Sequence, residues 1–309
     1  MLQHKAGIIP FIILIFGSLS FKWISRTADV SLIFEDITPR FVLFYDSANR
    51  IRASEAIRWR LWKKMYDFAA TPPTKAGDSI ARELLDKAWF KYPAILRKIS
   101  PSESQIIYEE AKSKVIQISN LLRPDSAIKI YLKLYVGGFE TNAFTTAFNQ
   151  RITTSIPFEI PTSVRTGLMI HELVHAINIG MGSFSGGWKR TIGTIVVSEG
   201  LAMRVSQIIS PGKPDSSYTE FTPGWLAQIS KKNKEVLKDL LKVLDSENDT
   251  DIMRFTMGKG PSGFEREAYY AGWIVVGYWL KHGRSVSSIA HIKEKDMAAE
   301  VKTALVLII

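Results

Sequence analysis

The sequence has no cysteine and only five histidines among its 309 residues. Without cysteine there is no disulfide framework, no thiolate-ligated zinc site and no thiol nucleophile. Any metal or hydrolytic chemistry must therefore come from His, Asp, Glu, Ser or Thr. A hydrophobic content of 46% with 23% charged residues also excludes a disordered tail, a collagen-like fibre and a polytopic membrane protein. The composition is that of a folded chain long enough to bury a sizeable core.

The charge balance is basic, with 40 Lys and Arg against 30 Asp and Glu and a net charge of +10. Such a surplus favours contact with a membrane or an anionic wall polymer. The basic residues are dispersed and no recognition motif accompanies them, so we expect no nucleic-acid binding. Residues 50–64 combine six basic side chains with Trp59 and Trp62. This stretch is either a face that lies on a membrane or polymer or, as we favour, a solvated face whose tryptophans turn into the core.

The first 26 residues have the layout of a targeting segment. Lys5 precedes an apolar run from Ala6 to Phe16, and small residues follow. A basic start, a short apolar middle and a small-residue end are typical of a secretory signal, and the run is short against the ~20 residues of a spanning helix. The sequence therefore predicts a signal peptide or N-terminal membrane anchor at 1–26. The protein would be extracytoplasmic, either secreted or tethered to the cell membrane by this segment.

The rest of the chain divides into two regions, a helical N-terminal region at 27–126 and a second region at 127–309. Residues 128–136 alternate apolar and polar side chains, which is typical of a half-buried strand. Two more strands follow, joined at Asn149 and Gln150 as a tight hairpin. Because these strands come before a series of helices, the sequence predicts an α+β fold. We expect it to be mainly helical, with a small, mostly antiparallel sheet packed on the next helix.

That next helix contains the motif HELVH at 171–175. On a helix His171 and His175 are one turn apart and project from the same face, so both imidazoles can bind one metal ion. Glu172 stands beside them, where it can act on a metal-bound water. An apolar stripe on the opposite face would bury the back of the helix. The motif therefore predicts one zinc ion per chain, against the alternative of two hydrogen-bonded core histidines.

A catalytic zinc site needs a third protein ligand, with water in the fourth position. No third histidine follows HELVH closely, but SEGLA places Glu199 24 residues after His175, in the first turn of a helix that we expect to begin near Ser198. If the two helices fold back on each other, Glu199 returns over the histidine pair and completes the site. The alternative is a carboxylate that only interacts with the helix dipole.

HELVHA followed by SEGLA resembles the gluzincin arrangement, in which HExxH is completed by a downstream glutamate. More narrowly, these motifs and REAYYAGWIVVGYWLKHG near the end resemble bacterial proteins predicted to be zinc-dependent proteases and known only as a domain of unknown function. The resemblance implies a zincin-like metallopeptidase domain at 127–309, with His171, His175 and Glu199 as zinc ligands and Glu172 as base. Met203 and Ser198 depart from the thermolysin-like and aminopeptidase branches, respectively.

The expected function is an exported zinc metallopeptidase that hydrolyses peptide bonds of a peptide or protein substrate. Glu172 would be the general base, and Tyr269 or Tyr270 would stabilise the oxyanion unless both are core residues. An edge strand within GGF or TNAFTT would hold an extended substrate by main-chain pairing. Two alternatives remain open: a zinc hydrolase of non-peptide substrates, and a catalytically inactive zincin-fold protein that binds an anionic cell-surface partner.

Overall fold

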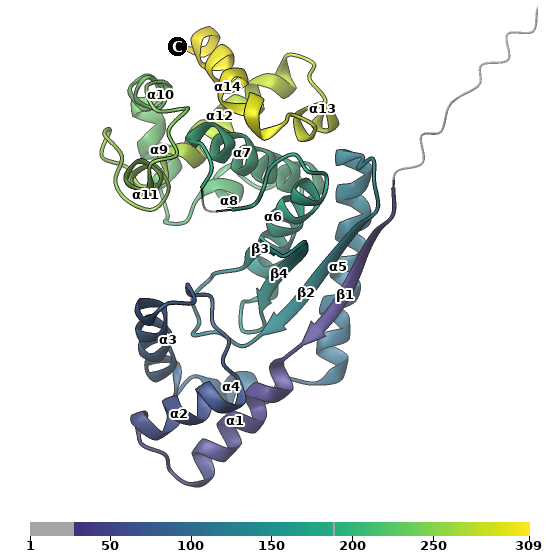
Figure 1. Ribbon diagram of the computed structural model, residues 1–309, viewed down its shortest axis with the longest axis vertical. Coiled ribbons are helices and arrows are strands. Elements are labelled where there is room, and N and C mark those ends of the chain that lie inside the picture. The colour runs from purple at the N-terminus through teal and green to yellow at the C-terminus, as the bar shows by residue number, and fades with distance from the viewer. Residues whose placement is uncertain (1–27, 188) are drawn as a thin grey trace, which may run out of the picture.

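The computed structural model describes residues 28–187 and 189–309, so the predicted signal or anchor at 1–26 lies outside the described residues. The fold is α+β and mainly helical, as predicted, with one small sheet. Figure 1 shows three levels: a group of N-terminal helices, the sheet in the middle, and a larger group of C-terminal helices.

The sheet has four strands in the order β1–β2–β4–β3. β1 pairs with β2 and β2 with β4 in parallel, and only β3 and β4 pair antiparallel, so the expectation of a mostly antiparallel sheet is wrong. The helices between β1 and β2 return the chain to the same end of the sheet, which makes that pairing parallel. β3 lies at the edge because β4 takes the place beside β2. The strands are β1 (Val30–Asp36), β2 (Ile128–Tyr135), β3 (Phe144–Phe148) and β4 (Arg151–Pro157).

The β3–β4 hairpin turns at Asn149 and Gln150, as predicted. Both residues have positive φ, +47° and +62°. Two consecutive left-handed residues are what a two-residue hairpin with the right-handed strand twist requires, and Asn tolerates this conformation well.

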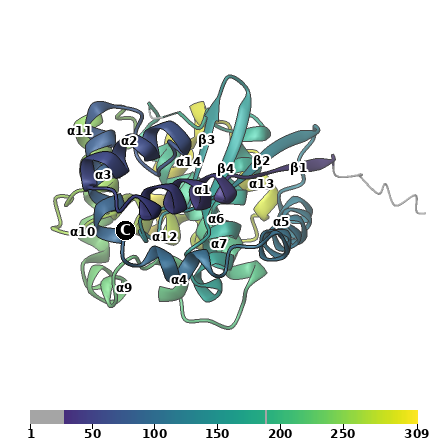
Figure 2. The ribbon, with the colours of Figure 1, turned by 90° about the horizontal axis from the view of Figure 1, so that it is seen from below.

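Two helices, α5 (Pro101–Leu122) and α6 (Thr162–Gly180), cover one face of the sheet. The apolar positions of β2 point toward them: Ile130, Leu132 and Leu134 are fully buried. α5 lies against β1 and α6 against β3 and β4, and Figure 2 shows α5 beside β1 on the side away from α2 and α3. The helix that carries HELVH therefore rests on the half of the sheet that ends in the edge strand.

The N-terminal helices form the lower part of the molecule in Figure 1. The predicted region 27–126 does not stand apart from the rest, because its β1 is a strand of the common sheet and its α5 packs on α6. In the basic stretch, Trp62 is buried and the Arg58 guanidinium lies 4.5 Å from the ring of Trp89, so part of this face belongs to the core. The helices are α1 (Thr38–Arg50), α2 (Glu55–Met65), α3 (Lys75–Ala88) and α4 (Tyr92–Leu96).

The C-terminal helices pack around α7 (Ile192–Ile209). This helix is long and apolar enough to cross a membrane, but 78% of its apolar window is buried inside the fold, as in the core helix of a globular protein. It touches α12 (Glu267–Lys281) closely, since a Cβ at Gly200 would lie 2.3 Å from the carbonyl oxygen of Gly272. The other elements are α8 (Ser216–Thr219), α9 (Trp225–Ile229), η1 (Ser230–Lys232), α10 (Asn233–Leu241), α11 (Asp249–Thr256), α13 (Val286–Ala290) and α14 (Glu294–Ile308).

Candidate metal centre

His171 and His175 lie in the middle of α6, one turn apart, with their Nε2 atoms 3.1 Å from each other. The back of the helix is fully buried at Ile170, Leu173 and Val174, in keeping with the predicted apolar stripe. The imidazoles project from the other face, where the His171 side chain keeps 20% of its surface exposed. The helix is thus fixed from behind and presents the two nitrogens at the front.

Glu199 reaches the same point from α7. This helix begins at Ile192, where Thr191 caps it by accepting a hydrogen bond from the amide of Thr194, so the expected start near Ser198 is wrong. Glu199 lies in the middle of the helix and not in its first turn, which removes the helix-dipole explanation for this carboxylate. The side chain is 5% exposed, and its Oε2 lies 3.1 Å from His171 Nε2 and 3.4 Å from His175 Nε2.

The three atoms therefore form a triangle with sides of 3.1, 3.1 and 3.4 Å. Two ligands of a tetrahedral zinc ion, each at 2.0–2.1 Å, are separated by about 3.3 Å. The triangle thus has the size of one face of such a coordination shell, and two imidazoles with a carboxylate are a donor set that zinc accepts. Ligand atoms of His171, Glu172 and His175 also lie within 4.8 Å of one another. The residues present fit a divalent metal ion.

The two glutamates of the centre have carboxyl pKa values that are shifted in opposite directions. Burial opposes ionisation of Glu199, but the charges of the histidines and their hydrogen bonds hold the pKa of its carboxyl well below the usual range. Burial raises the pKa of Glu172, against the opposing effect of His175 and His171. For His171, burial lowers the pKa, but the hydrogen bond and charge of Glu199 outweigh it and the pKa is raised. Glu199 is thus the anion of the centre, and Glu172 is a carboxyl poised to exchange a proton.

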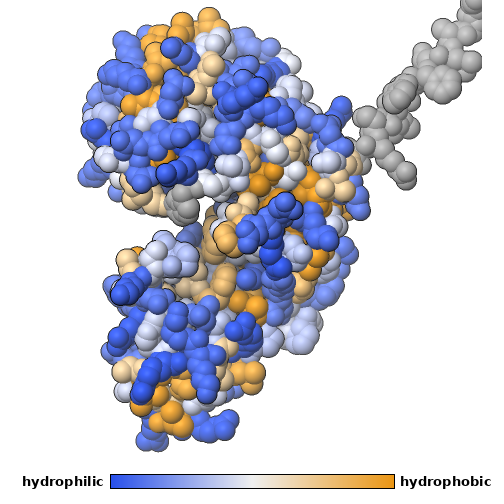
Figure 3. Space-filling model, viewed as in Figure 1, coloured by the Kyte–Doolittle hydropathy of each residue, from blue (hydrophilic) through white to orange (hydrophobic). Residues whose placement is uncertain are grey.

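The edge strand is joined to this centre by a hydrogen bond that no local sequence pattern predicts. The Thr145 hydroxyl on β3 donates to the backbone carbonyl oxygen of Glu172 at 2.9 Å. It also lies 3.1 Å from the Thr154 hydroxyl on β4. One strand edge therefore runs directly beside the general-base candidate. Figure 3 shows the surface hollowed at the level of β3 and α6, between the N-terminal and the C-terminal helices.

The hydroxyl groups of the two candidate tyrosines, Tyr269 and Tyr270, have different surroundings. The Tyr270 hydroxyl donates to Asn233 Oδ1 at 2.9 Å, and the residue is 2% exposed beside Trp225, as in the core alternative named for it. Tyr269, one residue earlier, lies close enough to the centre for the charges of Glu199 and Glu172 to raise the pKa of its hydroxyl. Burial and the neighbouring Glu199 carboxylate raise the pKa of the Tyr269 hydroxyl, which therefore stays protonated as a donor. It makes no hydrogen bond to another described residue.

Two arginines at the site were missed by the sequence analysis. Arg190, in the loop between α6 and α7, has a guanidinium nitrogen 4.0 Å from Glu199 Oε1, the oxygen that faces away from the histidines. Arg266, directly before α12, has its guanidinium over the rings of Phe221 and Tyr269. Arg266 is the first residue of the REAYYAGWIVVGYWLKHG segment, but nothing in that segment marks the arginine as a site residue, and Arg190 belongs to no motif. Only the fold brings both arginines to HELVH.

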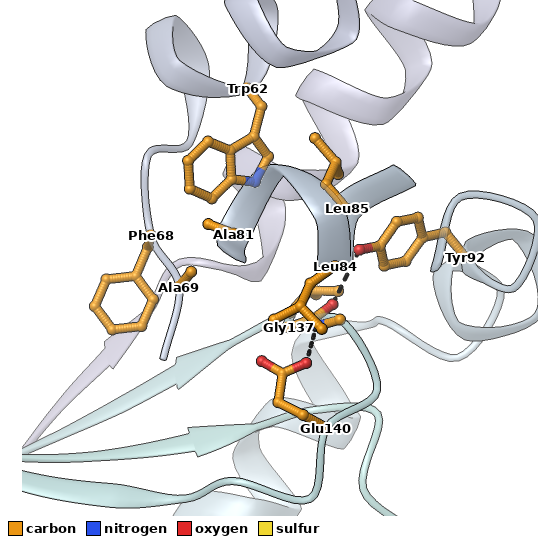
Figure 4. Close-up of a pocket in the computed structure, with 11 residues that line it drawn as sticks. Trp62, Phe68, Ala69, Ala81, Leu84, Leu85, Tyr92, Gly137 and Glu140 are labelled. Carbon is orange, nitrogen blue, oxygen red and sulfur yellow. Dashed lines mark hydrogen bonds between the residues drawn. The ribbon is translucent and has the colours of Figure 1, made fainter. Parts of the chain in front are cut away.

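A second group of polar side chains holds the loop at 137–140, which contains the predicted GGF segment. Glu159 accepts hydrogen bonds from the amides of Gly137 at 2.9 Å and Phe139 at 3.3 Å, and Glu140 accepts from Gly138 at 2.7 Å. Figure 4 shows Glu140 on one side of the loop and Tyr92 on the other. The pocket here is about 10 Å³, the space of roughly one water molecule, and is too small for a substrate. We call Glu140, Glu159, Tyr66 and Tyr92 the loop cluster.

The remaining histidines of the described residues lie elsewhere. His282 directly follows α12 as its C-cap, and its ring nitrogen lies 2.8 Å from the carbonyl oxygen of Tyr278. His291 pairs with Asp125.

Comparisons with protein-family models, with curated proteins and with solved structures find no match to this chain. The function must therefore be argued from the geometry of the metal centre.

Proposed function

We propose that the protein is a zinc-dependent peptidase of the gluzincin type, with a zincin-like arrangement of the α6 helix against the sheet. One observation carries the proposal: His171 Nε2, His175 Nε2 and Glu199 Oε2 converge at 3.1–3.4 Å with Glu172 beside them. Two histidines and a carboxylate around one point, with a second carboxylate next to it, are the donor set and base of a hydrolytic zinc site.

Each side chain then has a defined task. His171, His175 and Glu199 would hold the metal, which when bound supplies a Lewis acid that activates water at neutral pH. Glu172 accepts the proton of the attacking water and returns it to the leaving amine, a task suited to a carboxyl whose pKa is raised by burial. The protonated hydroxyl of Tyr269 donates to the oxygen on which negative charge develops. Arg190 keeps Glu199 oriented through its second oxygen.

The edge strand favours an extended peptide as substrate. β3 has a paired side toward β4 and an unpaired side, and Thr145 fixes it beside Glu172. A peptide that adds to this edge by main-chain hydrogen bonds would pass along the helix that carries the base. Export and a contact of the basic surface with a membrane or wall polymer stay part of the proposal, supported by the sequence of residues 1–26 and the net charge.

The proposal is tested first by metal content, measured by mass spectrometry on the full chain after exposure to zinc. We expect about one zinc per chain, none in His175→Ala, and a reduced amount in Glu199→Ala. His282→Ala is the matched control, because it removes a histidine that caps α12 and leaves the centre intact. A folded, unmodified chain without zinc would overturn the proposal and favour an inactive surface-binding protein. Zinc without cleavage of any peptide in a library would favour a non-peptide hydrolase.

A further inference from the structure

Arg266 is a cation beside Tyr269, at the edge of the metal centre. Its guanidinium carbon lies 4.5 Å from the ring centre of Phe221 and 5.2 Å from that of Tyr269. Among residues 28–187 and 189–309, no carboxylate lies within 4.0 Å of it. The two rings hold the flat group in place and leave its five N–H donors available. An ordered guanidinium with unused donors is suited to an incoming anion.

The backbone at Arg266 has a conformation that rarely suits a long side chain. Its φ is +57°, in the left-handed region that favours glycine. The next residue, Glu267, is fully buried and accepts hydrogen bonds from the amides of Ser262 and Phe264, which fixes the turn that leads into α12. The fold therefore imposes the conformation on position 266, yet the chain places a long cationic side chain there.

The charge of Arg266 acts on the metal centre. It lowers the pKa of the Tyr269 hydroxyl against the opposing charge of Glu199, and Arg190 acts in the same direction. Because the guanidinium lies over the Tyr269 ring, it is within reach of a substrate that touches the Tyr269 hydroxyl.

The sum of the charges at the metal centre favours the binding of an anion. Glu172 and Glu199 supply two negative charges, and Arg190 and Arg266 supply two positive charges, so the side chains balance. A divalent metal ion at the histidines then leaves an excess of positive charge in a partly buried site. A substrate group with negative charge would offset this excess, which a neutral peptide segment does not.

We propose that Arg266 binds a carboxylate of the substrate beside the scissile bond, so that the site prefers acidic peptides. The geometry that carries this inference is the unpaired guanidinium stacked on Phe221 and Tyr269. The carboxylate comes either from the C-terminus of the peptide or from an aspartate or glutamate side chain. The inference rests on the proposed peptidase function and specifies its substrate class.

The test measures binding without turnover, by calorimetry on the zinc-loaded full chain carrying Glu172→Gln. The probes are acetylated tetra-alanine as the free acid and as the amide, and an acetylated, amidated peptide with one Glu and its Gln counterpart. The first pair detects a terminal carboxylate and the second pair a side-chain carboxylate. We expect one pair to show on the order of tenfold tighter binding of the acidic member, the range of a charge-assisted hydrogen bond.

Arg266→Gly in the same background should abolish that preference while the protein stays folded, since glycine relieves the positive φ. Arg266→Lys should retain part of it. Arg123→Gly is the matched control, because Arg123 also has a positive φ, +55°, but is an exposed residue at the end of α5. This control should keep the full preference for the acidic peptide. A preference that survives in Arg266→Gly, or equal binding of both members in both pairs, would overturn the inference.

These outcomes are separate from those of the proposed function. Loss of zinc binding or of hydrolysis contradicts the peptidase, whichever peptide binds more tightly. Cleavage of neutral and acidic peptides at equal rates, with equal affinities, would leave the peptidase in place and remove the role of Arg266. If no probe binds at all, the inference is wrong, because the site then has no affinity for a peptide carboxylate.

Discussion

The molecule builds two clusters from the same kinds of side chain, glutamate and tyrosine, and uses them in opposite ways. In the loop cluster every group holds the backbone. The Tyr66 hydroxyl donates to the carbonyl oxygen of Val136 at 3.0 Å and accepts from its amide at 2.7 Å. Tyr92 donates to the carbonyl oxygen of Gly137, and Glu159 accepts from two amides. In the metal centre the Tyr269 hydroxyl bonds to no other described residue, and Glu172 stands beside the histidines.

The difference extends to the charge of the carboxylates. Burial raises the pKa of Glu159 to about 7, because the neutral amides that bind it recover only part of the lost hydration and the neighbouring Glu140 adds to the rise. The pKa of Glu199 is well below normal, since two histidines compensate for its burial. A buried carboxylate that binds only backbone amides, such as Glu159, therefore holds a loop in place. A buried carboxylate beside two histidine nitrogens, such as Glu199, can form part of a binding site. Where a side chain of the metal centre has no hydrogen-bond partner among the described residues, we expect the substrate to provide one.

The largest expected effect separates Glu172 from Glu159. Glu172→Gln removes the proton acceptor, and we expect kcat for peptide hydrolysis to fall by about 10²–10⁴-fold while zinc content stays the same. Glu159→Gln is the matched control, because it makes the same chemical change at a buried carboxyl that belongs to the loop cluster, and it should retain turnover. The measurement is steady-state cleavage with metal analysis of each variant. Normal turnover in Glu172→Gln would contradict its role as the base.

The metal ligands could be predicted from the sequence because their geometry is local or nearly so. The spacing of His171 and His175 gives one helix face whatever the rest of the fold does. Glu199 was found by elimination and by its distance along the chain, although its helix starts at Ile192, six residues before the expected start near Ser198. Tyr269 and Tyr270 could not be told apart from the sequence, because two adjacent helical positions point in different directions and only the packing of α12 on α7 decides between them.

The sheet was predicted less well than the helices for a related reason. Alternation identified the buried face of β2, and the turn residues identified the β3–β4 hairpin. Strand order depends on contacts between distant residues, such as Val30 with Ile128 across the whole N-terminal helical region. No local pattern encodes such a pairing, so β1 was not assigned to the sheet and its parallel direction was missed. The contact of Arg266 with Phe221 also joins distant residues, so no local pattern predicts it.

The next effect contrasts two tyrosines. Tyr269→Phe removes a donor from the metal centre, and we expect kcat to fall by about 10²-fold with little change in stability. Tyr66→Phe should do the reverse: it leaves both the amide and the carbonyl of Val136 unsatisfied inside the protein and should cost about 1–3 kcal/mol of unfolding free energy, with kcat unchanged. Denaturant unfolding and cleavage assays on the same preparations measure both quantities. A stability loss at Tyr269, or a kcat loss at Tyr66 alone, would contradict the division between the clusters.

The last prediction uses pH to separate the two buried carboxylates. The pKa of Glu159 is higher in the folded protein, about 7, than in the unfolded chain, so the folded state binds this proton more tightly. Its contribution to stability is complete below about pH 4.5 and is lost as pH rises toward 7, by about 3 kcal/mol in all. Glu199 has the opposite sign, because its pKa is lowered: it contributes above the unfolded value and loses that contribution as pH falls.

Glu159→Gln should therefore flatten the decline in stability between pH 5 and 7 in the zinc-free protein, and Glu199→Gln should leave that decline in place. Urea unfolding at half-unit pH steps provides the measurement. The Gln side chain at position 159 keeps one carbonyl oxygen for the amides of Gly137 and Phe139 but does not titrate, so it isolates the proton from the hydrogen bonds. If the decline between pH 5 and 7 persists in Glu159→Gln, another group causes it. The electrostatic contrast between Glu159 and Glu199 would then be wrong.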